Sequence, residues 1–334
     1  MGWGGYSLCV VSSFCFSVGG PGRGYGLEEL LAVGVPREPA DFGRFWRGRR
    51  DAAARVEPRP LLGEVVEERD GFRVHEVFYD ALGGRCAALL ALRCDGPVRH
   101  GFVIGHGYGG RKDAGADIPL PLAESAAILP IAPGLPALGL RPGVPSDPDG
   151  HVLHGIGSRD TYLIGDCVAA VWGAASALLE LVPSAALDGR RLGYLGESFG
   201  GGIGALALPW DDRFAAAGLT VPTFGNHPLR CTLPCTGSGE SVRTHVREHP
   251  EALDVLAYFD AATAATHLRI PVLSACALFD PVVPPPGQFA VHNALAGPRR
   301  LEVLDAGHLP YPGEPEQRRQ LGQVTSEFFG SWMG

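Results

Sequence analysis

The decisive stretch of this 334-residue chain is Gly196-Glu197-Ser198-Phe199-Gly200. It follows a short apolar run at 191–195 and precedes a run of small residues at 201–207. A Gly-x-Ser-x-Gly motif between a strand and a helix is typical of a sharp turn that exposes a serine hydroxyl. The turn forces the serine into strained φ and ψ angles, and flanking glycines avoid the clash that a Cβ would make. The chain holds 48 glycines, so the five-residue pattern alone could arise by chance. We interpret Ser198 as a nucleophile because the pattern also lies between a strand and a helix.

The pattern around this motif alternates between apolar strands and amphipathic helices. Alternation of this kind with short connections predicts an α/β fold, a doubly wound and mostly parallel sheet of the α/β-hydrolase type. The expected strands are 72–81, 86–93, 101–105, 126–132, 219–221, 270–278 and 300–304. The expected helices lie within 27–59, broken at Pro36 and Pro39, and at 161–181 and 317–332. Between the first two strands, Leu82-Gly83-Gly84 signals a hairpin.

We expect one α/β-hydrolase domain over 25–334, with an insertion at about 225–268 that is polar, partly helical and rich in His and Arg. Residues 1–24 carry a short apolar run with no Arg or Lys before Arg23. A secretory signal needs a basic start, and the run is too short to span a bilayer. We interpret 1–24 as an appended or disordered segment, with a weak signal sequence as the alternative.

A serine nucleophile needs a base, and the base needs an acid to orient it. In α/β-hydrolases the chain order is Ser, then Asp or Glu, then His. Asp280 follows the apolar strand at 270–278, and His308 follows the next strand. Both positions lie at the carboxyl ends of strands, where a parallel sheet gathers its active site. The sequence therefore predicts Ser198, Asp280 and His308 as a catalytic triad.

The negative oxygen of a tetrahedral intermediate needs two N–H donors aimed at it. One donor is expected from the residue after the nucleophile, Phe199. The other is expected from the loop at 106–110 after an early strand, where Tyr108 is the best candidate. We also expect the rings of Phe199 and Tyr108 to crowd the acyl site and to favour short acyl chains.

Composition excludes several other classes of function. The net charge of −8 gives no reason to expect a nucleic-acid partner. The eleven histidines include one His-x-x-x-His pair, His245 and His249, and two histidines that flank a loop, His151 and His154. We interpret neither pair as a metal site, so we expect neither a metal nor another cofactor. The eight cysteines fit free thiols in a reducing compartment, which predicts a cytoplasmic protein with no membrane attachment.

From about Asp41 to its C-terminus the chain also resembles the acetyl xylan esterase and cephalosporin-C deacetylase esterases, carbohydrate esterase family 7. The motifs that carry the resemblance are His106-Gly107-Tyr108-Gly109-Gly110, the glycine-rich motif at 196–201, Tyr258-Phe259-Asp260, residues 278–285 with Phe289-Ala290 and Asn293, and Gly307-His308. The resemblance implies the same triad and oxyanion residues, acetylated sugars and related small esters as substrates, and a homo-oligomer. Phe199 stands where this family usually has Gln.

The leading hypothesis is a serine carboxylesterase that acts on short-chain O-acyl esters. A second hypothesis keeps the triad but assigns it to larger esters, thioesters or peptides. A third is a binding protein with a hydrolase fold and no activity, which the presence of all three triad residues in the expected order disfavours.

Overall fold

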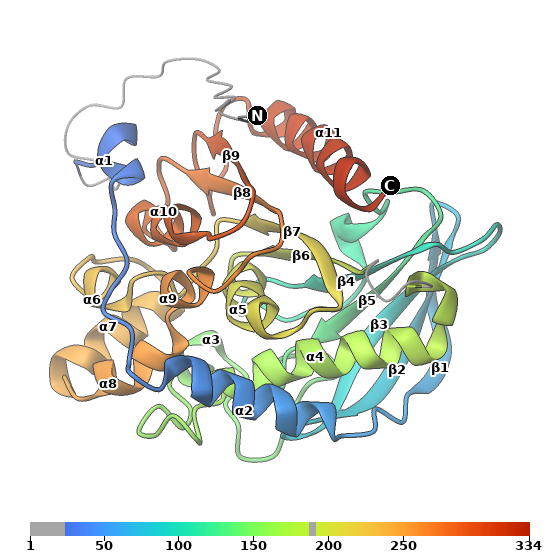
Figure 1. Ribbon diagram of the computed structural model, residues 1–334, viewed down its shortest axis with the longest axis horizontal. Coiled ribbons are helices and arrows are strands. Elements are labelled where there is room, and N and C mark those ends of the chain that lie inside the picture. The colour runs from blue at the N-terminus through green and yellow to red at the C-terminus, as the bar shows by residue number, and fades with distance from the viewer. Residues whose placement is uncertain (1–23, 187–191) are drawn as a thin grey trace.

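The protein is described by a computed structural model of residues 24–186 and 192–334. The expectation about residues 1–24 therefore lies outside the described part of the chain, apart from Gly24. Figure 1 shows a central sheet with helices on both sides. The strands are β1 Leu61–Arg69, β2 Phe72–Ala81, β3 Gly84–Arg93, β4 His100–Gly105, β5 Ser125–Ile131, β6 Leu192–Glu197, β7 Phe214–Thr220, β8 Val272–Ala277 and β9 Arg299–Leu304.

The strands of the described residues form one sheet in the order β1-β2-β3-β5-β4-β6-β7-β8-β9. Strands β1, β2 and β3 pair antiparallel, and β3 joins β5 antiparallel. From β5 to β9 every pair is parallel. Parallel strands end at the same edge, so the loops after β4, β6, β8 and β9 lie along one rim of the sheet. The predicted doubly wound, mostly parallel sheet is confirmed.

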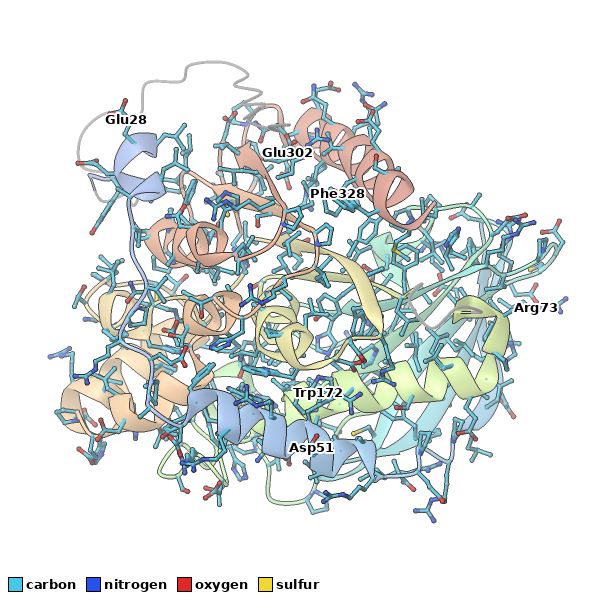
Figure 2. The ribbon with its side chains drawn as sticks, in the orientation of Figure 1. Glu28, Asp51, Arg73, Trp172, Glu302 and Phe328 are labelled. Atoms are coloured by element: carbon cyan, nitrogen blue, oxygen red, sulfur yellow. The ribbon has the colours of Figure 1, made fainter. Side chains whose placement is uncertain are left out.

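Helices cover both faces of this sheet. They are α1 Leu27–Leu31, α2 Phe42–Ala54, α3 Pro148–His151, α4 Ile164–Leu181, α5 Phe199–Ala207, α6 His227–Arg230, α7 Ser238–Glu248, α8 Ala252–Leu256, α9 Ala261–Ala265, α10 Pro285–Ala294 and α11 Glu314–Met333. In Figure 1, α2 and α4 lie below the sheet and α11 lies above it. Buried apolar side chains form a large core under α4 and α5 and a smaller one under α11. Phe328 of α11 belongs to the smaller core, whereas Arg73 and Glu28 lie at the periphery (Figure 2).

Two strands differ from the sequence-based expectation. β1 was not predicted: it is an edge strand whose exposed residues include Leu61, Leu62, Val65 and Val66, and irregular register with β2 removes the alternation that marks a strand. β7 begins at Phe214 and is longer than the predicted 219–221. Its Phe-Ala-Ala-Ala-Gly start has little intrinsic strand preference, so its place between β6 and β8 decides its conformation.

Helix α4 is apolar on most of its surface because it packs between the sheet and α2. It is the one helix of the described chain with the length and composition to cross a membrane, and 72% of it is buried inside the fold. The expected insertion at 225–268 contains the short helices α6 to α9. Asp260 starts α9 as its N-cap, since its Oδ1 accepts the amide of Thr263 at 2.9 Å.

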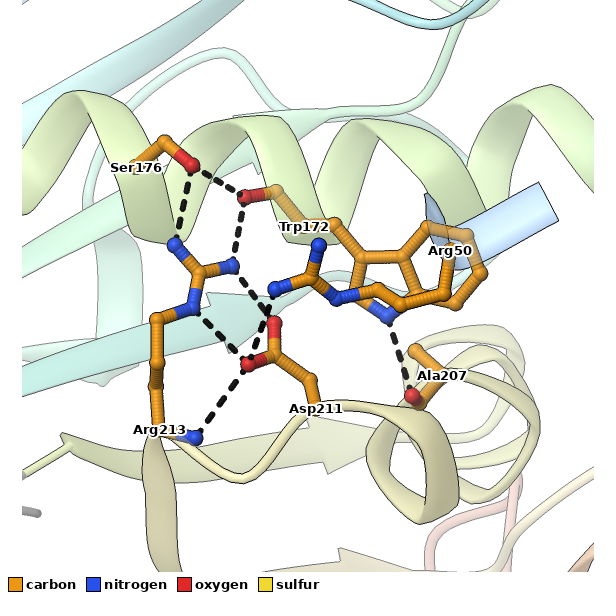
Figure 3. Close-up of polar contacts among 6 residues, drawn as sticks. All are labelled: Arg50, Trp172, Ser176, Ala207, Asp211 and Arg213. Atoms are coloured by element: carbon orange, nitrogen blue, oxygen red, sulfur yellow. Dashed lines mark hydrogen bonds and ion pairs between the residues drawn. The ribbon is translucent and has the colours of Figure 1, made fainter. Parts of the chain in front are cut away.

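A buried ionic cluster ties α2 and α4 to the loop before β7 (Figure 3). Arg213 donates from Nε to Oδ1 of Asp211 at 2.8 Å, and also bonds Ser176 Oγ and the Trp172 carbonyl on α4. Arg50 of α2 places Nη2 3.4 Å from the same carboxylate. Burial by itself would raise the pKa of Asp211, but the hydrogen bonds and charge of Arg213, with the charge of Arg50, outweigh it and hold that pKa below its usual value.

Candidate active site

Ser198 lies in the sharp turn between β6 and α5. Its backbone angles are φ 55° and ψ −113°, outside the conformations that most residues adopt. The turn is held by backbone bonds: the Ser198 amide donates to the Thr220 carbonyl at 2.9 Å, and its carbonyl accepts the amides of Gly202 and Thr223. The strain therefore persists because the neighbouring β7 and α5 fix both sides of the peptide.

Glycine is required on both sides of Ser198 for steric reasons. A Cβ at Gly196 would lie 2.5 Å from the carbonyl carbon of Gly200, and a Cβ at Gly200 would lie 2.6 Å from that of Gly105. Both contacts are with backbone atoms, which cannot rotate away. The close approach of β4 and α5 through these glycines explains the Gly-x-Ser-x-Gly pattern at this position.

The structure brings together the three residues predicted as a triad. Ser198 Oγ lies 2.8 Å from His308 Nε2, and His308 Nδ1 lies 2.7 Å from Asp280 Oδ2. A carboxylate only accepts, so Nδ1 carries the proton and Nε2 is left to accept from the serine hydroxyl. The Asp280 side chain is fully buried, and that of His308 is 19% exposed.

Asp280 is held by a complete set of hydrogen bonds. Its Oδ1 accepts the amides of Val282 and Val283, each at 2.9 Å. Its Oδ2 accepts the side-chain amide of Gln288 at 2.9 Å in addition to His308. Gly307 permits this packing, since a Cβ there would lie 2.5 Å from Asp280 Oδ2.

The two amides predicted to bind the oxyanion lie on adjacent segments, one on the loop after β4 and one at the start of α5. β4 and β6 are neighbours, and the Gly200 amide donates to the His106 carbonyl at 2.9 Å, which joins the Tyr108 loop to the start of α5. Phe199 is the first residue of α5, so its amide has no intrahelical acceptor. Within the described residues, the amides of Tyr108 and Phe199 donate to no protein acceptor. Neither amide is therefore committed to a protein acceptor.

Two buried histidines fix the loop that carries Tyr108. Tyr108 Oη donates to His151 Nδ1 at 2.9 Å, because His151 Nε2 donates to the Pro133 carbonyl at 2.8 Å. His106 Nε2 accepts the Ala132 amide at 3.0 Å. Burial lowers the pKa of His151 and lowers that of His106 to about 4, so both rings are neutral and serve as hydrogen-bonding struts. Burial also raises the pKa of Tyr108 well above its usual value.

Ser198 and His308 open into a cavity of about 410 Å³. Its other lining residues are Gly105, His106, Gly107, Tyr108, Gly110, Arg111, Lys112, Asp113, Ala114, Gly115, Asp117, Glu197 and Val282. The lining is rich in charged and polar side chains, and Arg111 is paired with Asp117 at its wall. It suits a polar ligand better than a long hydrocarbon chain.

The ring of Phe199 lies elsewhere than the sequence led us to expect. It is only 2% exposed, is absent from the lining of the Ser198 cavity, and packs behind Tyr108 with 4.3 Å between ring centroids. Helix α5 turns this side chain into the core, so the acyl site is not crowded by two aromatic rings. Of the two rings, only that of Tyr108 belongs to the cavity wall.

The sequence did not indicate the supporting roles of His151 and Gln288. In the sequence His151 is one of two histidines that flank a loop, and its contact with Tyr108 joins segments that are far apart in the chain. Gln288 lies in an apolar helix with no motif of its own. In the described residues no group of three or more His, Cys, Asp or Glu side chains is arranged to hold a metal ion.

The sheet order and the Ser-His-Asp arrangement at its rim define an α/β-hydrolase. The acetyl xylan esterase (AXE1) family model matches residues 26–323, so the chain belongs to this family, and it is a carboxylic ester hydrolase. The resemblance noted in the sequence is thus confirmed.

Solved structures with a similar fold include two acetyl xylan esterases and a peptidase. The enzymes from Paenibacillus sp. R4 and Thermoanaerobacterium sp. JW/SL YS485 have TM-scores of 0.76 at 20% and 19% identity. Each alignment covers 90% of this chain and 99% of the other. The acylaminoacyl peptidase of Pyrococcus horikoshii has a TM-score of 0.57 at 14% identity, over 84% of this chain and 43% of its own. At these identities the likeness establishes the fold.

Proposed function

We propose that the protein is a serine esterase that removes short acyl groups, above all acetyl groups from acetylated sugars, through the triad Ser198, His308 and Asp280. The observation that carries this proposal is the continuous hydrogen-bonded chain from Ser198 Oγ through His308 to Asp280 Oδ2. The polar cavity beside Ser198 supports a sugar as the alcohol part of the ester. The names of the similar solved structures and the family support acetylated xylan as the model substrate.

In the first half of the reaction, Ser198 Oγ attacks the ester carbonyl carbon while His308 Nε2 takes the hydroxyl proton. The carbonyl oxygen gains a negative charge, which the amides of Tyr108 and Phe199 stabilise. Asp280 stabilises the imidazolium that forms and keeps its Nδ1 proton pointed inward. His308 then gives its Nε2 proton to the departing sugar oxygen, which leaves an acetyl ester on Ser198.

In the second half, water replaces the sugar. His308 Nε2 removes a proton from the water as its oxygen attacks the acetyl carbon, and the same two amides hold the new oxyanion. Collapse of the intermediate breaks the bond to Ser198 Oγ, which recovers its proton from His308. The products are acetic acid and the restored enzyme, and His308 carries each proton moved in the two steps. The released acid then loses its proton to water and becomes acetate.

The test is release of acetate from acetylated xylo-oligosaccharides and hydrolysis of p-nitrophenyl acetate by the Ser198→Ala variant. We expect kcat to fall about 10⁴-fold or more, because nucleophile, base and oxyanion donors act as a unit. Ser331→Ala is a matched control, since this exposed serine lies near the end of α11 and bonds only its own helix. Retention of esterase activity in a clean Ser198→Ala preparation would refute the assignment.

A further inference from the structure

Gln288 on α10 is buried directly behind the proposed acid. Its side chain is fully buried, and all of its amide hydrogen-bonding groups are used. Nε2 donates to Asp280 Oδ2 at 2.9 Å and to the Val283 carbonyl at 2.7 Å, while Oε1 accepts the Ala277 amide at 2.8 Å. These contacts join the end of β8, the turn that carries Asp280, and the first turns of α10.

The orientation of this amide is set by its partners. Ala277 offers a backbone N–H and therefore needs the side-chain oxygen. Asp280 and Val283 offer oxygen acceptors and therefore need the two hydrogens of Nε2. A flipped amide would lose all three bonds, so the donor to Asp280 is defined by the surroundings.

Gln288 donates to Oδ2, the same oxygen of Asp280 that accepts the hydrogen bond from His308. The χ2 torsion of an aspartate is intrinsically broad, and the carboxylate plane must therefore be set by its contacts. Val282 and Val283 fix Oδ1, and Gln288 is the contact besides His308 that fixes Oδ2.

We propose that Gln288 is a positioning residue for the reaction: it holds the Asp280 carboxylate in the plane that presents Oδ2 to His308 Nδ1. This inference rests on the proposed triad. Gln288, on α10, supports catalysis through Asp280 alone and does not contact the substrate. Small errors in the geometry of reacting groups lower rates strongly, so a rotated carboxylate should reduce turnover without changing substrate binding.

The first experiment compares Gln288→Met with wild type, using p-nitrophenyl acetate. Methionine keeps the length of the side chain but donates no hydrogen bond to Asp280. We expect kcat to fall about 10–100-fold, the size expected for the loss of one hydrogen bond to a charged group, with KM within about twofold of wild type. Val291→Ala is the matched control, because Val291 is also buried on α10 but bonds neither Asp280 nor its turn.

Two further readouts separate positioning from a loss of folding. The His308 Nδ1 proton should give a downfield proton NMR signal in the wild type and in Val291→Ala, and a shifted or broadened signal in Gln288→Met. In an Asp280→Asn background, Gln288→Met should cause no further fall in kcat, since the residue through which it acts is already disabled. Gln288→Glu should be at least as impaired as Gln288→Met, because it sets a second carboxylate against Asp280.

An unchanged kcat in folded Gln288→Met would overturn this inference. So would an equal loss in Val291→Ala, or a full further loss in the Asp280→Asn background. These results are distinct from failure of the proposed function: activity in Ser198→Ala removes the triad itself, whereas inactivity of Ser198→Ala with normal Gln288→Met removes only the role of Gln288.

Discussion

Two buried aspartates in this molecule have opposite surroundings. Asp211 is 3% exposed and Asp280 is 1% exposed. Asp211 lies between two arginines, Arg213 and Arg50, in the cluster that joins α2, α4 and the loop before β7. Asp280 is held by neutral amides, and within residues 24–186 and 192–334 the one basic side chain paired with it is that of His308.

The difference separates a structural carboxylate from the one that we propose to be catalytic. At Asp211 the permanent charges of the arginines compensate the buried charge, and the result is a fixed connection between elements. At Asp280 the carboxylate is oriented by amides, and in the proposed mechanism its charged partner is the imidazolium that His308 forms during the reaction. A buried acid that is hydrogen-bonded to a histidine at the wall of a cavity is an arrangement expected of a catalytic site.

Of the substitutions at these two aspartates, Asp280→Asn should have the largest effect, a fall in kcat. Asparagine can present an N–H donor where His308 Nδ1–H needs an acceptor, which favours the wrong tautomer. The corresponding change in a serine protease lowers kcat about 10⁴-fold. Steady-state kinetics with p-nitrophenyl acetate measures the loss. If Asp260→Asn or Asp305→Asn produces the loss instead, the acid has been assigned to the wrong residue.

Asp211→Asn should lower the stability of the fold and leave catalysis unchanged. Removing this carboxylate leaves Arg213 and Arg50 partly buried without their counter-charge, and breaking such a pair lowers the free energy of unfolding by about 3 kcal/mol. The kcat per folded molecule should be unchanged, since no atom of the cluster lies at the cavity. Urea unfolding followed by circular dichroism gives the free energy of unfolding. Steady-state kinetics without urea gives kcat.

The pH dependence of stability should distinguish wild type from Asp211→Asn. The folded pKa of Asp211 is lowered, so its contribution is present above the unfolded value near 4 and is lost as pH falls through the folded value. The stability difference between the two proteins should therefore be constant from about pH 5 to 7 and should shrink below about pH 4. A difference that grows on acidification would contradict the role of the two arginines.

A smaller effect is expected from the length of the acyl chain. The sequence predicted a preference for acetyl to butyryl groups from two crowding aromatic rings, but the ring of Phe199 is buried in the core. The polar cavity wall supports the same preference for a different reason, because a methylene gains about 0.8 kcal/mol only when its surroundings are apolar. We expect kcat/KM to be highest for p-nitrophenyl acetate or butyrate and about 10-fold lower or more for octanoate. A maximum at octanoate or laurate would show that an apolar acyl channel exists.

The sequence could predict most of the sheet and the position of each triad residue. Ser198 directly follows β6, and Asp280 and His308 come within four residues of the ends of β8 and β9. Parallel strands bring their carboxyl ends to one rim, so residues just after them lie near one another. The edge strand β1 could not be predicted, since its side chains are exposed on both faces and show no alternation. Local pattern reveals a strand only where burial imposes one.

The parts of the site that escaped prediction depend on contacts between distant segments. The direction of the Phe199 ring follows from the start angle of α5, which the strained Ser198 sets. The bonds of His151 to Tyr108 and of Gln288 to Asp280 require the folded positions of α3 and α10. Residue type alone does not distinguish such side chains from ordinary core residues.

In the proposed mechanism, Ser198 carries the acyl group during turnover. The most direct measurement mixes the enzyme with p-nitrophenyl acetate, quenches with acid within the first turnovers, and locates the added acetyl group by mass spectrometry of peptides. We expect one acetyl group on the peptide that contains Ser198 in the wild-type enzyme and none on that peptide in Ser198→Ala. Turnover with no acetyl group on that peptide, or with the group on another residue, would contradict this mechanism.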